Sequence, residues 1–152
     1  MKFPETLLTI LLLAAILVGC GGGKEDEAAP KAQDPAATAA ALDQGPRAAE
    51  NFTLDDGLAE RGAILFEEKI CSDCHTMGEA DLAPDLVGVL ERRTRPWLMK
   101  QITDPEWMNE HDPITRALIE EFDLEMVGVE VSATEAEAIL HYLAREGGDR
   151  AD

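Results

Sequence analysis

The strongest constraint on this chain is a five-residue motif, Cys71-Ser72-Asp73-Cys74-His75. Two thiols at this spacing are able to bond the vinyl-derived carbons of one porphyrin, and the histidine that follows presents its imidazole to the iron. The motif therefore predicts one covalently attached haem c, with Cys71 and Cys74 as attachment points and His75 as an axial ligand. The chain has only 4 Phe, 2 Trp and 1 Tyr, so a large apolar group would also help to fill a small domain.

Three other chemistries use cysteines at this spacing, and the rest of the chain argues against each. A thioredoxin-like redox pair belongs in a βαβ context, and the sequence has no such pattern. A zinc site needs a second pair of ligands, and His111 and His141 do not stand at finger spacing. A structural disulfide between Cys71 and Cys74 is compatible with an exported protein, but it gives no reason for His75.

The N-terminus has the pattern of an export signal. A lysine at position 2 precedes an apolar run over residues 7–18, which is shorter than the roughly 20 residues that a membrane-spanning helix needs. The run ends in Leu17-Val18-Gly19-Cys20, which resembles the bacterial lipobox. We therefore expect a lipoprotein signal peptide over residues 1–19 and a lipid on Cys20. The alternative is an ordinary signal peptide with an incidental cysteine.

The composition changes after Cys20. Residues 20–51 are rich in Gly, Ala, Pro and acidic side chains and have almost no large apolar residue. Such a segment buries too little surface to offset its chain entropy. We predict a disordered tether over 20–51, a folded domain over 52–146 and a disordered tail over 147–152.

The signals within the predicted domain are helical. Proline follows a capping residue closely near positions 94, 104 and 112, and Ser132 and Glu135 form a capping box before an apolar helix face. The side chains of Ile114, Leu118 and Phe122 recur at i, i+4 and i+8. No hairpin signal and no internal repeat is present in the sequence. We predict an all-α domain of about four to five helices.

Residues 56–146 resemble a class I (mitochondrial-like) cytochrome c domain. The segment from 59 to 66 is similar to the N-terminal helix of that family, with Gly62 one turn from the aromatic Phe66. Ile139 and Tyr142 match the aliphatic and aromatic positions of its C-terminal helix. The resemblance implies a small cytochrome c fold around one haem. It also implies a crossing of two helices at Gly62, where a glycine permits close approach.

The same resemblance implies a partner for the axial imidazole. The segment Ala83-Pro84-Asp85-Leu86 is similar to the family's Pro-x-Leu segment, in which the proline carbonyl accepts a hydrogen bond from the histidine. That bond would set the tautomer of His75 and strengthen its iron-bound nitrogen as a donor. Pro84 is the expected acceptor; the alternative is that it only shapes a loop.

The resemblance also implies a methionine as sixth iron ligand. Met126 stands in an irregular stretch shortly before the last predicted helix, where the family's ligand lies, although Val127 replaces the proline that often follows. Met108 is the next candidate, followed by His111, His141 or an open site. We expect iron to be bound by His75 and Met126.

Charge limits the partners. The formal net charge is −18, from 31 acidic and 13 basic residues, and nucleic-acid binding needs a basic face. We expect a monomer that meets redox proteins through their basic docking faces; adaptation to high salt is the competing explanation of the acidity. The cluster of Trp97 with Arg92, Arg93, Arg95 and Lys100 is able to neutralise haem propionates, or it is a solvated helix start with Trp97 in the core.

These features together predict a membrane-tethered, extracytoplasmic electron carrier of the periplasm or the outer face of the cytoplasmic membrane. Its iron would cycle between Fe(II) and Fe(III), and a thioether ligand favours the reduced state. We do not expect an enzyme, because a carrier binds no substrate and makes no bond. The alternatives are a haem sensor or gas-binding domain with an open sixth position, and a detached module of a larger oxidoreductase.

Overall fold

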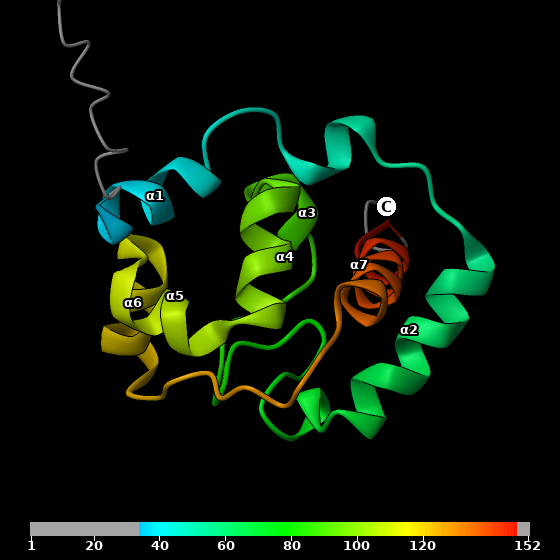
Figure 1. Cartoon of the computed structure of the whole chain (residues 1–152). Coiled ribbons are helices and arrows are strands. Elements are labelled where there is room, and N and C mark those ends of the chain that lie inside the picture. The colour runs from blue at the N-terminus through cyan, green and yellow to red at the C-terminus, as the bar shows by residue number, and fades with distance from the viewer. Residues whose placement is uncertain (1–33, 149–152) are drawn as a thin grey trace, which may run out of the picture. The chain divides into compact units, whose positions relative to one another are not determined.

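The computed structural model describes residues 34–148, and the helices there confirm the all-α prediction, with no strand in this part of the chain. The elements, coloured along the chain in Figure 1, are α1 (Pro35–Leu42), η2 (Ala48–Asn51), α2 (Asp56–Glu68), η3 (Cys71–Asp73), α3 (Val89–Arg92), α4 (Arg95–Thr103), α5 (Pro105–His111), α6 (Pro113–Phe122) and α7 (Ala133–Gly148). Five of these correspond to predicted helices: α2, α4, α5, α6 and α7. Helix α1 and the single turn α3 were not predicted.

Side-chain caps, predicted for all of the following helices except α2, account for where the helices begin. The side chains of Asp55, Thr94, Asp104 and Asp112 each accept a hydrogen bond from a backbone N–H in the first turn of the helix that follows. At α7, Ser132 Oγ accepts from the N–H of Glu135 at 3.3 Å, while the Ser132 N–H donates to Glu135 Oε2 at 2.8 Å. These bonds satisfy N–H groups that have no partner inside a helix. Helix starts are therefore local in origin.

Helices α2 and α7 cross in close contact, at the right of Figure 1. A Cβ added to Gly62 would lie 2.0 Å from the carbonyl oxygen of Ala138, so only glycine fits at this point. One turn along, the rings of Phe66 and Tyr142 meet with centroids 5.2 Å apart. Ile139 is buried beside them, 2% exposed. The expected crossing at Gly62 is confirmed.

The prediction of a disordered tether over 20–51 is wrong for residues 34–51. Helix α1 packs against α4, α5 and α6, with Ala39 fully buried, and η2 places Ala48 in the hydrophobic core. Small side chains allow α1 to come close, and Leu42 is the one large apolar residue of the segment 34–51 that packs against the core. The folded unit therefore begins at least 18 residues before the predicted boundary at 52, counting from Asp34.

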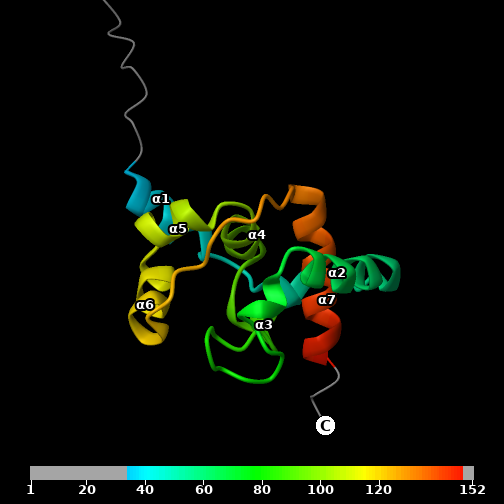
Figure 2. The same cartoon turned by 90° about the horizontal axis from the view of Figure 1, so that it is seen from below.

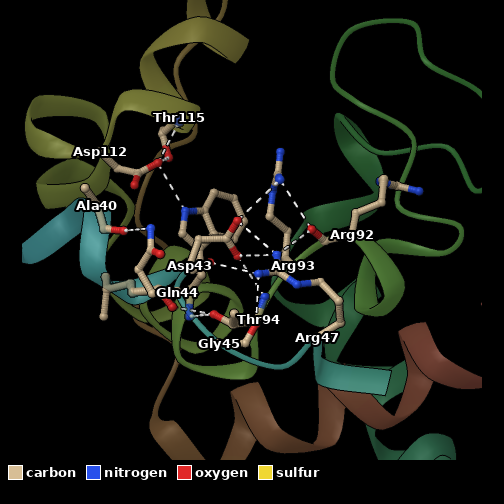
Figure 3. Close-up of polar contacts among 12 residues, drawn as sticks. Ala40, Asp43, Gln44, Gly45, Arg47, Arg92, Arg93, Thr94, Asp112 and Thr115 are labelled. Carbon is tan, nitrogen blue, oxygen red and sulfur yellow. Dashed lines mark hydrogen bonds and ion pairs between the residues drawn. The ribbon is translucent and has the colours of Figure 1, made fainter. Parts of the chain in front are cut away.

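The half-buried carboxylate of Asp43 secures this N-terminal segment. Asp43 Oδ1 accepts the Thr94 N–H at 2.9 Å and pairs with Arg47 at 3.0 Å, while its Oδ2 lies 3.6 Å from Arg93 Nη1. Figure 3 shows Asp43 between these partners. The Thr94 hydroxyl in turn donates to the carbonyl of Leu42. Apart from the i,i+4 pair of Asp43 with Arg47, these contacts join residues about 50 positions apart, and no local pattern indicates those.

The remaining boundaries are described only in part. Helix α7 continues through Gly148, two residues past the predicted domain end at 146. The predicted signal peptide, Cys20, the tether up to residue 33 and positions 149–152 lie outside the described residues. Within residues 34–148, no helix has the length and apolar character needed to cross a membrane.

Candidate haem site

The Cys-x-x-Cys-His motif follows directly on α2 through a sharp turn. Ile70 has a left-handed backbone, φ 53°, which is a rare conformation for a β-branched residue. The turn leads into η3, where the N–H groups of Cys74 and His75 both donate to the carbonyl of Cys71 at 3.3 and 3.0 Å. Cys71, Cys74 and His75 all line one cavity. Both thiols are free, and burial raises the pKa of the Cys71 thiol, which keeps it protonated.

The His75 ring is oriented by a backbone carbonyl. Its Nδ1 lies 3.1 Å from the carbonyl oxygen of Pro84, and a carbonyl only accepts, so Nδ1 carries the proton. Burial lowers the pKa of His75, an effect that the Pro84 contact opposes. The imidazole is therefore held neutral with the lone pair on Nε2, which is the form that binds a metal. Pro84 lies where the sequence analysis expected the acceptor.

A cleft lies between the motif and the α6–α7 connection. It consists of two adjoining cavities, of about 260 and 150 Å³. The residues that line both are Cys71, His75, Pro84, Gln101, Leu118, Met126 and Val129. Most of the lining side chains are apolar, and the stripe on α6 contributes Leu118 and Phe122. The motif, the imidazole acceptor and Met126 thus border one space, although they come from segments far apart in the sequence.

The donor set and the lining fit a covalently attached haem. Two free thiols and a neutral imidazole stand on one side of an apolar cleft, and a thioether stands at its border. An apolar cleft with a few placed polar groups is typical of cofactor sites. In residues 34–148 no cluster of three or more His, Cys, Asp or Glu side chains offers a separate metal site.

The remaining candidate ligands lie elsewhere. Met108 is fully buried in α5 within the hydrophobic core and lines neither cavity. His141 is buried on α7, where its Nδ1 accepts the Asp55 N–H at 3.0 Å. His111 ends α5 with its ring 5.0 Å from that of Trp107. Of the candidates predicted from the sequence, only Met126 borders the cleft with His75.

The basic cluster is divided by the fold. Trp97 is buried, and its Nε1 donates to Asp112 Oδ1 at 3.1 Å. Arg92 and Arg93 line the smaller cavity with Trp97, whereas Arg95 is paired with Glu137 and Lys100 with Asp104. The guanidinium groups of Arg92 and Arg93 therefore border the cleft. Trp97 lies in the hydrophobic core, as expected if the cluster marks a helix start.

Sequence reasoning missed Gln101, which lines both cavities. Its amide Nε2 lies 3.4 Å from the sulfur of Met126. A lone glutamine inside a predicted helix carries no pattern that would have identified it.

Comparison with known proteins agrees with this geometry. The family model described as Cytochrome c matches residues 59–145. A solved structure of cytochrome c from Rhodothermus marinus is similar, with 30% identity and a TM-score of 0.63, and the match covers 77% of this chain and 100% of that one. An engineered Rhodothermus marinus cytochrome c bound to a carbene intermediate is also 30% identical, with a TM-score of 0.60 and coverage of 76% and 99%. No curated protein matches the sequence.

Proposed function

Because the chain belongs to the cytochrome c family, whose members use haem for electron transfer, we propose that it is a class I, monohaem, one-electron carrier anchored outside the cytoplasm. The observation that carries the proposal is the cleft that joins Cys71, Cys74 and His75 to Met126. Bound haem supplies a reversible Fe(II)/Fe(III) couple. The chain supplies attachment, ligands and an apolar enclosure, and no bond in a substrate is made or broken.

Attachment uses the two thiols. Cys71 and Cys74 would hold the haem through thioether bonds; addition of each S–H across one vinyl group would need no oxidant and would lose no atom. Acid and organic solvent should therefore leave the haem on the unfolded polypeptide. Complete extraction of the colour would contradict covalent attachment. Cys71→Ala and Cys74→Ala should each leave one thioether and a shifted spectrum.

His75 and Met126 are assigned as the residues that would bind the iron. The Pro84 carbonyl orients the imidazole, burial keeps it neutral, and the thioether of Met126 would favour the reduced iron, which raises the potential. Met126→Ala should abolish the iron–thioether absorption of the oxidised protein and lower its potential, whereas Met108→Ala should do neither. An exchange of these two results would refute the assignment. Rapid binding of carbon monoxide by the unmodified reduced protein would instead favour a sensor with an open sixth position.

Anchoring is assigned to Cys20. Thirteen residues separate Cys20 from Asp34, and a chain of that length spans at most about 45 Å. The redox partner should therefore meet the domain close to the membrane, or belong to the same membrane. Stable anchoring needs at least two acyl chains, so Cys20→Ser should release the protein or leave it unprocessed. A variant that stays bound to the membrane after signal cleavage would contradict the lipid assignment.

The partner should present a basic face. Asp73 and Glu125 are exposed at the cleft, and the formal charge of the whole chain is −18. A field of this sign raises encounter rates with a basic surface by roughly 10- to 1,000-fold and fades as salt shortens the Debye length. The transfer rate should fall with ionic strength, and Glu125→Gln should lower it more than the matched change Glu60→Gln on α2. A rate independent of salt would favour adaptation to high salt instead.

A further inference from the structure

The α6–α7 connection, residues 123–132, is here called the Met126 loop. It has no regular secondary structure, and Figure 1 shows it as an orange strip along the ends of α4 and α5; Figure 2 shows the same course after a 90° turn. Three side chains of α4 and α5 bond to it. Gln101 Nε2 donates to the Met126 sulfur at 3.4 Å, Asn109 Nδ2 donates to the Met126 carbonyl at 2.8 Å, and Glu106 Oε1 accepts the Gly128 N–H at 2.7 Å.

The fit around these bonds is close. A Cβ added to Gly128 would lie 2.6 Å from Glu106 Oε1, so a side chain at this position would displace the carboxylate from its present place. Asn109 Oδ1 is buried without a partner, which is unfavourable. The Nδ2 of the same amide, however, donates to the Met126 carbonyl, and this bond holds the amide in place. Both features indicate that the loop is held at specific points.

A hydroxyl group sets the orientation of the Gln101 amide. Thr115 Oγ1 lies 2.7 Å from Gln101 Oε1 and 3.0 Å from Asp112 Oδ1, and it has one proton to donate. Asp112 Oδ1 already accepts the N–H groups of Trp97 and Thr115 at 3.1 and 2.7 Å. We therefore assign the proton to the shorter contact with Gln101. That choice places Nε2 next to the sulfur of Met126. Figure 3 shows Asp112 beside Thr115.

We propose that Gln101 is a positioning residue that tunes Met126 as an iron ligand, and that Asn109 and Glu106 hold the Met126 loop closed. This inference rests on the proposed role of Met126. A thioether sulfur has two lone pairs, and an N–H bonded to one withdraws electron density from the other. The weaker donor stabilises Fe(III) less, so the Gln101 contact raises the reduction potential. The bonds of Asn109 and Glu106 to the loop backbone instead lower the rate at which Met126 dissociates from the iron.

The two kinds of contact predict different signatures in the haem-loaded protein. Gln101→Leu should shift the reduction potential downward and keep the iron–thioether absorption. Thr115→Val, which frees the amide to turn, should shift it in the same direction by less. Asn109→Ala should make carbon monoxide bind to the reduced protein roughly tenfold faster, the factor that corresponds to loss of a hydrogen bond of about 1.4 kcal/mol.

Matched controls come from residues away from the cleft. Gln44 donates to a backbone carbonyl of α1 at 3.3 Å, and Asn51 is exposed in η2. Gln44→Leu should leave the potential unchanged, and Asn51→Ala should leave the rate of carbon monoxide binding unchanged. A potential for Gln101→Leu equal to that of Gln44→Leu would overturn the tuning role. A binding rate for Asn109→Ala equal to that of Asn51→Ala would overturn the holding role.

The Met126→Ala variant shows separately whether Met126 is the iron ligand. If Met126→Ala retained the iron–thioether absorption, Met126 would not be the ligand, and the proposal for Gln101 would be refuted with it. If Met126→Ala lost the absorption while Gln101→Leu left the potential unchanged, the ligand would stand and only the tuning role would fall.

Discussion

Replacement of Gly62 by alanine tests the crossing of α2 and α7 with a single methyl group. Its carbon would lie 2.0 Å from the Ala138 carbonyl oxygen, 2.6 Å from the Ala138 carbonyl carbon and 2.9 Å from Tyr142 Cβ. Cβ atoms essentially never approach another heavy atom more closely than 3.0 Å, so relief of the first clash requires the backbones to separate by about 1 Å. A helix backbone cannot rotate away as a side chain would.

The cost follows from the contacts that this separation weakens. A gap of about 0.5–1 Å forfeits a quarter to a half of the 0.1–0.2 kcal/mol of each atom pair. For the roughly 50 pairs that one well-buried side chain makes, the loss is about 3 kcal/mol. Alanine recovers about 1 kcal/mol, because glycine disfavours a helix interior. The net expectation for Gly62→Ala is a loss of about 2 kcal/mol in the free energy of unfolding.

Urea unfolding of the haem-loaded protein, followed by helical circular dichroism, measures this loss. With a slope of about 2 kcal/mol per molar, the midpoint should fall by about 1 M at unchanged slope. Gly57→Ala is the control in the same helix, since its Cβ would meet only a side-chain oxygen of Asp55 at 3.3 Å. Its midpoint should stay the same or rise slightly. Equal midpoints for the two variants would refute the close crossing as the reason for glycine at 62.

Three further predictions concern other parts of the fold. Asp43→Ala removes the partner of the Thr94 N–H and of two arginines, and should lower the free energy of urea unfolding by about 2–3 kcal/mol; an unchanged midpoint would contradict the N-terminal network. A chain that begins at residue 52 should unfold at a lower temperature than one that begins at 34, because it lacks buried Ala39 and Ala48, and equal transitions would restore the tether interpretation. The backbone N–H of Ser132 lowers the pKa of Glu135, so its stabilisation is present above the ordinary pKa of 4.5 and is lost as pH falls through the lower native value. Glu135→Gln keeps the acceptor but cannot titrate, and its stability should fall less steeply below pH 4.5 than that of the unmodified chain.

Short sequence patterns, each spanning only a few residues, determined where most helices begin and where the haem would attach. The caps at Asp104 and Asp112 and the capping box at Ser132 act over three residues, and each begins a helix where the sequence placed it. The haem motif is equally local, because the porphyrin itself dictates the spacing of its thiols and histidine. Local signals of this kind can be recognised without knowledge of the fold.

The N-terminal segment shows where such signals end. Residues 34–51 have the composition of a tether, although Asp34 and Pro35 repeat the capping pattern that begins α5 and α6. Their order comes from partners about 50 residues away, above all Thr94 and Arg93 on Asp43, and from the close approach that small side chains such as Ala39 allow. Composition measures how much surface a segment is able to bury alone, and it carries no information on what the rest of the fold offers.

The residues of the haem site also fall into those that the sequence identified and those that only the tertiary structure revealed. The sequence identified Cys71, Cys74 and His75 by their chemistry, and it proposed Met126 and Pro84 by resemblance. Only the tertiary structure set Met126 at the cleft and Met108 in the core, since both are methionines in the same part of the chain. It alone brought Gln101 to the sulfur. Local chemistry is written in adjacent residues, whereas the choice among equivalent side chains depends on distant segments that meet only when the chain has folded.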